Sequence, residues 1–94
     1  METDLKDSCL FPEVTFSAFI MSLASAALVG LGEAPDPETG KTETNLSLAR
    51  HNIDLLDMLL EKTSGNLNKR EQELLDNLLY DLRVKYIMRR DNAD

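Results

Sequence analysis

The stretch VTFSAFIMSLASAALVGLG, which runs from Val14 to Gly32, contains no charged side chain. Its only polar side chains are those of serine and threonine, which are small. A helix on the surface of a monomer normally shows a polar face, so a helix that is apolar on every side has to be buried on every side. This stretch therefore decides how the rest of the chain must be arranged.

Thr15 is a suitable N-cap for a helix in this stretch, and Gly30 and Gly32 provide its stop. We expect this first helix to run from about Phe16 to Leu31. The prolines, glycine and charges from Glu33 to Thr44 are typical of a loop.

A second helix is predicted from about Leu46 to Thr63, capped by Asn45 or Thr44 and closed by Gly65. Apolar residues recur there every three or four positions, which is the spacing of one helix face. A second stripe of three leucines lies beside this main stripe on the same helix. The two stripes comprise Leu46, Ala49, Ile53, Leu56 and Leu60, and Leu48, Leu55 and Leu59.

A third helix is predicted from about Lys69 to Arg89. Asn68 suits its N-cap, and Glu71 completes a capping box in which Asn stands where Ser or Thr is usual. Gly65 suits the end of the second helix, so a tight helical hairpin is expected between them. The apolar face of the third helix comprises Leu74, Leu75, Leu78, Leu79, Leu82 and Tyr86.

The predicted fold is all-α: a three-helix domain made of the apolar first helix and a helical hairpin. The 94 residues leave room for one domain. We divide the chain into a mobile acidic N-terminal tail at 1–14, the helical domain at 15–90 and a C-terminal tail at 91–94. A domain of this size buries a modest core and is often stabilised by association with other copies.

Small side chains recur every four residues along the first helix, at Ala18, Ser22, Ala26 and Gly30. Such a stripe lets two helix backbones approach closely and gain dispersion contacts. We therefore expect two or more copies to associate through this stripe. Another side of the same helix is expected to pack on the hairpin, through Phe16, Phe19, Ile20, Leu23, Ala27 and Leu31.

Three other interpretations of the first helix stay open. Its 19 uncharged residues could just cross a bilayer. However, many are Ala, Ser and Gly, and Glu13 and Glu33 flank the stretch without a nearby basic residue or an aromatic belt. A membrane partner is therefore not expected. The helix could also be the centre of a compact monomer, or dock on a different protein.

A second apolar group lies on the back of the third helix, at Tyr80, Val84 and Ile87, away from the leucine face. Isolated apolar residues on a surface are common and need no function. The same three residues could equally form part of an interface. We include them among the candidate interface residues.

The net charge of −7 argues against general nucleic-acid binding, which depends on neutralising phosphates. The exception is the segment from Arg83 to Arg90, which has four bases, no acid and an interleaved tyrosine. These bases also complement the dipole at the end of a helix. An accessory role on nucleic acid, using this basic end, is the alternative function.

No motif predicts catalysis, a metal or a cofactor. Gly40-Lys41-Thr42 resembles the end of a phosphate-binding loop, but Pro35 stands where that loop needs a glycine. His51 and Cys9 are single residues of their kind and have no evident catalytic partner. The lone cysteine favours a reducing compartment, so we expect a cytoplasmic protein.

The chain resembles the bacterial domain-of-unknown-function family 1844 over about residues 15–86. The resemblance implies a small helical bacterial protein without an assigned activity, and it provides no catalytic residues. It is carried by Phe16-Ser17-Ala18-Phe19, Ser22-Leu23-Ala24, Leu31-Gly32-Glu33, Ile53-Asp54-Leu55-Leu56, Gly65-Asn66-Leu67 and Tyr80-Asp81-Leu82-Arg83.

Together these features predict a non-catalytic protein-interaction module. We expect it to form homo-oligomers or to serve as an accessory subunit of a larger bacterial complex. Within the chain, we also predict an ion pair between Asp54 of the second helix and Arg83 of the third.

Overall fold

A computed structural model describes residues 13–92 and folds them into three α-helices, with no strand in that range. The helices are α2 (Phe16–Gly30), α3 (Leu46–Lys62) and α4 (Lys69–Asp91). The all-α, three-helix prediction is confirmed. The expected N-terminal tail falls almost entirely outside the described residues, as do residues 93–94 of the expected C-terminal tail, while α4 itself reaches Asp91.

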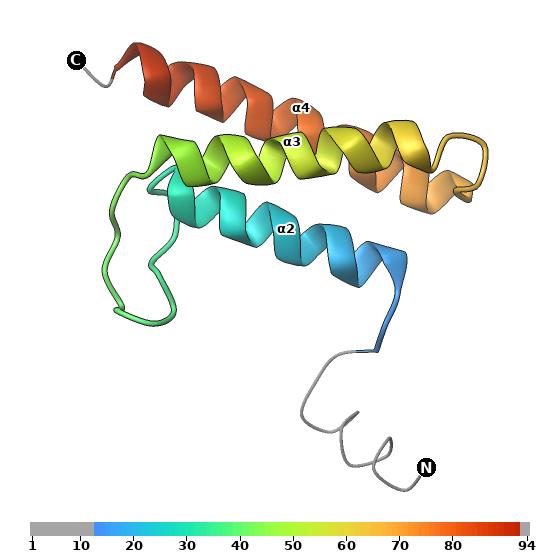
Figure 1. Cartoon of the computed structure of the whole chain (residues 1–94), viewed down its shortest axis with the longest axis horizontal. Coiled ribbons are helices and arrows are strands. Elements are labelled where there is room, and N and C mark those ends of the chain that lie inside the picture. Colours follow the sequence, from blue (N-terminus) through green and yellow to red (C-terminus); the bar gives the residue numbers. More distant parts are fainter. Residues whose placement is uncertain (1–12, 93–94) are drawn as a thin grey trace, which may run out of the picture.

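Helix α3 is the central element of the fold (Figure 1). It forms the hairpin with α4, and α2 packs mainly against α3 and more lightly against α4. The long loop between α2 and α3 lies at the opposite end of the molecule from the hairpin turn (Figure 1). This arrangement covers one side of α2 and leaves its other side to solvent.

The three helices begin where side chains cap them. The Thr15 hydroxyl accepts a hydrogen bond from the Ala18 amide at 3.0 Å, and the Asn45 side chain accepts one from the Leu48 amide at 3.1 Å. At the start of α4 the capping box is complete. Asn68 Oδ1 accepts from the Glu71 amide at 2.8 Å, while Glu71 Oε1 accepts from the Asn68 amide at 3.0 Å. These bonds satisfy amides that have no partner inside the helix.

Helix α2 ends in a Schellman motif that needs a glycine. The Glu33 amide donates to the Leu28 carbonyl at 2.9 Å, and the Gly32 amide donates to the Val29 carbonyl at 3.0 Å. Gly32 has φ +78°, a left-handed conformation that glycine adopts without a steric penalty. The loop that follows is closed at its base, because the Asn45 amide donates to the Gly30 carbonyl at 2.7 Å.

The core lies where the three helices meet and is almost entirely aliphatic. Among the described residues, the one buried polar side chain is that of Asn52, whose amide donates to the Leu48 carbonyl at 3.0 Å. The buried apolar residues are Ile20, Ala24, Ala27, Leu31, Ala49, Ile53, Leu56, Leu75, Leu79 and Leu82.

The side of α2 that packs on the hairpin differs in part from the predicted one. Ile20, Ala27 and Leu31 are buried as expected, but Phe19 is 50% exposed and Ala24 takes its place in the core. The buried side of α2 is therefore shifted around the helix, away from Phe19 and toward Ala24. The small Ala24 and Ala27 let α2 lie close to its neighbours, whereas a phenylalanine there would hold the helices apart.

Candidate interaction surfaces

The solvent side of α2 carries no charge. We call this surface the outer face of α2. It comprises Ala18, Phe19, Met21, Ser22, Ser25, Ala26 and Val29. Phe19 and Met21 are 50% and 46% exposed, and the two serines are also exposed. Because solvent-facing helix surfaces are usually polar, an uncharged face with large exposed apolar residues is a candidate interaction surface.

The predicted small-residue stripe lies only partly on this face. Ser22 is exposed, and Ala18 and Ala26 are half-buried, so these three contribute to the outer face. Gly30 does not, because it is buried against the start of α3. A Cβ atom at Gly30 would lie 2.6 Å from the Ala49 nitrogen and 2.8 Å from the Asn45 oxygen. Gly30 therefore has to be removed from the predicted interface.

A shallow hollow lies beside the outer face of α2, between that helix, the loop and the first turn of α3. Val29 and Leu48 line it together with Pro37. The loop itself contains an Asx turn, in which Asp36 Oδ1 accepts from the Glu38 amide at 2.8 Å. Leu48, which was predicted to flank the stripe of α3, thus extends the exposed apolar surface of α2 instead of the core.

A second apolar surface runs along the back of α4. Tyr80 is 74% exposed, Val84 39% and Ile87 47%, so all three predicted residues face solvent. Met88 is exposed beside them and was missed. The same spacing could have identified it, since it lies four residues after Val84. We call these four residues the α4 strip.

The basic end of α4 is charge-balanced. Lys85 donates to Asp81 at 2.9 Å, Arg89 lies 3.5 Å from Glu33, and Arg90 lies 3.3 Å from Asp91. The hydrogen bond to Asp81 raises the pKa of Lys85 above its usual value. Since each base already has a carboxylate neighbour, this end offers little unbalanced positive charge for a phosphate backbone.

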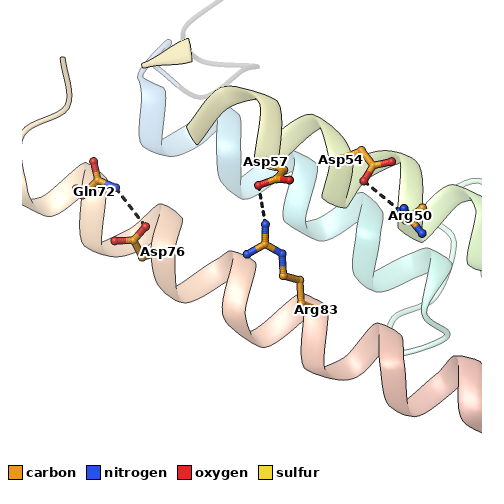
Figure 2. Close-up of polar contacts among 6 residues, drawn as sticks. All are labelled: Arg50, Asp54, Asp57, Gln72, Asp76 and Arg83. Carbon is orange, nitrogen blue, oxygen red and sulfur yellow. Dashed lines mark hydrogen bonds and ion pairs between the residues drawn. The ribbon is translucent and has the colours of Figure 1, made fainter. Parts of the chain in front are cut away.

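Arg83 pairs with α3, but not with the predicted acid. Its guanidinium donates to Asp57 Oδ1 at 2.6 Å, whereas Asp54 accepts from Arg50 Nε at 3.2 Å (Figure 2). The predicted contact between Asp54 and Arg83 is therefore wrong by one helical turn. The register of the hairpin places Asp57, and not Asp54, across from Arg83.

Two further polar side chains, those of Asp76 and His51, lie on the surface. Asp76 accepts a hydrogen bond from the Gln72 side chain at 3.2 Å (Figure 2). His51 is exposed at the edge of a shallow hollow, next to Arg50 and Asp54. Between residues 13 and 92, no three His, Cys, Asp or Glu side chains are grouped as a metal site would need.

Within the same residues, none of the helices combines the length and the apolar character needed to cross a membrane. Helix α2, the most apolar of them, has 15 residues.

The family model for a domain of unknown function, DUF1844, matches residues 13–88, so the chain belongs to this family. No curated protein and no solved structure matches the chain.

Proposed function

We propose that this protein is a non-catalytic interaction module whose copies associate through the outer face of α2. The observation that carries the proposal is the combination of exposure and absence of charge on this face. Phe19 and Met21 are half exposed, yet no charged residue occurs between Val14 and Gly32. Burying such a surface removes apolar area from water, which contributes roughly 25 cal/mol per Å².

The composition of the face favours a second helix as its occupant. Ser22 and Ser25 are short, and Ala18 and Ala26 are shorter still, so a helix from another copy can approach closely between the larger Phe19 and Met21. A symmetric contact would place the same face on both copies, as is usual in homodimers. The exposed Leu48 would add apolar area at one end of the contact.

A single charge on this face tests the proposal. We expect Ser22→Glu to weaken self-association at least about 100-fold, because burying an unpaired carboxylate costs several kcal/mol. Ser22 is exposed and its hydroxyl bonds only to the Phe19 carbonyl within α2, so the fold should tolerate the change. The measurement is the dissociation constant from sedimentation velocity of the full chain over a range of concentrations.

The matched control is Ser47→Glu, which makes the same substitution at an exposed helical serine in the first turn of α3. It should leave the dissociation constant unchanged. The proposal is wrong if the unchanged protein is monomeric at every concentration, or if Ser22→Glu associates as strongly as the control. Circular dichroism of both variants checks that helicity is retained.

The same face could instead dock on a different protein in a larger complex. An affinity purification distinguishes self-association from such docking. Recovery of untagged copies of the chain alone would support a self-contained assembly. Recovery of a different protein in near-stoichiometric amount, lost with Ser22→Glu, would make the chain an accessory subunit. We place this role in the cytoplasm, because the sequence contains a single cysteine and so no disulfide within the chain.

A further inference from the structure

Met21 differs from the other side chains of the outer face of α2 because it alone contains sulfur. The rest of this face consists of alanine, serine, valine and phenylalanine, which peroxides leave intact under conditions that oxidise methionine. Met21 is 46% exposed, so its thioether is open to solvent in the free chain. The outer face of α2 therefore contains one side chain whose polarity an oxidant can change.

We propose that Met21 is a reversible oxidation site that controls self-association, an inference that rests on the proposed function. Hydrogen peroxide transfers one oxygen atom to the sulfur of Met21. A lone pair of the sulfur forms the new S–O bond, the O–O bond of the peroxide breaks, and the other oxygen leaves as water. The thioether is thereby oxidised by two electrons to a sulfoxide. Methionine sulfoxide reductases return the sulfoxide to the thioether with electrons from a thiol.

The sulfoxide makes this position of the outer face of α2 polar. Its oxygen is a hydrogen-bond acceptor, and covering it with a second copy would remove the water that binds it. A twofold contact contains Met21 from both copies, so a fully oxidised pair would bury two such oxygens. Oxidation should therefore weaken self-association by at least about tenfold.

Two other exposed methionines lie outside the outer face of α2 and serve as internal references. Met58 is 43% exposed beside Glu61 on α3. Met88, in the α4 strip, is 58% exposed beside Lys85. Because charged neighbours keep both sites hydrated, sulfoxides there remain in water and should leave self-association unchanged.

Oxidation of the full chain at several protein concentrations tests the proposal. Peptide mass spectrometry measures the oxidation rate of each methionine in dilute hydrogen peroxide. The rate at Met21 should fall as the protein concentration rises, because the dimer covers this side chain, whereas the rates at Met58 and Met88 should stay constant. Sedimentation velocity should then show weaker association of the oxidised protein. Treatment with methionine sulfoxide reductases and a thiol should restore the original dissociation constant.

Met21→Leu removes the sulfur and keeps an apolar side chain of similar size. This variant should associate as the unchanged protein does, and its dissociation constant should stay the same after treatment with peroxide. Met58→Leu is the matched control, because it removes an equally exposed methionine from a different helix. It should remain as sensitive to peroxide as the unchanged protein.

The inference is wrong if the oxidised protein associates as strongly as the reduced one, or if peroxide weakens Met21→Leu as much as the unchanged protein. Protection of Met88 instead of Met21 at high concentration would place the contact on the α4 strip, which would also overturn the inference. A reduced chain that is monomeric at every concentration, or that associates equally well with Ser22→Glu, would overturn the proposed function and this inference with it.

Discussion

Gly30 lies where the last turn of α2 meets the start of α3, and its lack of a side chain sets how close the two helices come. An alanine in place of a helical glycine normally stabilises a protein by about 0.5–1 kcal/mol. Here we expect the opposite sign, because the added Cβ would lie 2.6 Å from a backbone nitrogen of Ala49. Moving a backbone to relieve such a contact costs about 1–3 kcal/mol.

Gly30→Ala should therefore lower the free energy of unfolding by about that amount, measured by urea denaturation. Ser25→Ala is the matched control, since it lies on the exposed side of the same helix and alanine is the better helix former. It should be neutral or slightly stabilising. Equal stability of Gly30→Ala and the unchanged protein would mean that α2 and α3 are less closely packed than described.

At the scale of the element, the start of α4 depends on its capping box. Asn68→Ala removes the acceptor for the Glu71 amide, and we expect a loss of about 1 kcal/mol in the free energy of unfolding. Asn66→Ala in the same turn is the control, because Asn66 is exposed and only its backbone amide forms a hydrogen bond to the Thr63 carbonyl in the described residues. In thermal unfolding, the melting temperature of Asn68→Ala should be several degrees below that of Asn66→Ala.

The helix ends could be predicted from the sequence because each capping interaction is local. Thr15, Asn45 and Asn68 each accept from an amide three residues later, so the signal lies within one turn of chain. The orientation of α2 could not be predicted in the same way. With no charge between Val14 and Gly32, nothing in that stretch marks which side faces water, and Phe19 was assigned to the core although it is half exposed.

The partner of Arg83 could not be predicted from the sequence either, because it depends on how α3 and α4 pack. The acids Asp54 and Asp57 both lie on the polar side of α3, and no sequence pattern distinguishes them. The choice depends on how far α4 is displaced along α3 after the hairpin turn, which is a property of packing. The exposed Tyr80, Val84 and Ile87 could be identified because the leucine face of α4 marks its opposite side.

At the scale of the whole molecule, the proposed contact through the outer face of α2 sets the size of the assembly. A chain whose copies pair through one twofold interface forms a closed dimer. We expect light scattering to give the mass of a dimer for the unchanged protein and for Ser47→Glu, and the mass of a monomer for Ser22→Glu at the same concentration. A dimer from Ser22→Glu would mean that the copies associate through a different surface.

The loop between α2 and α3 is closed at its base by the hydrogen bond from the Asn45 amide to the Gly30 carbonyl. Its far end holds Gly40, whose amide donates to the Asp36 carbonyl at 2.7 Å and where an added Cβ would meet no atom within 4 Å apart from its chain neighbours. The two ends of the loop are thus already joined, and doubling the length of a loop costs only about 0.6 kcal/mol in closure entropy. Gly40 is therefore a natural insertion point for an epitope or a fluorescent reporter, which would follow the assembly in cells while both chain termini stay unaltered.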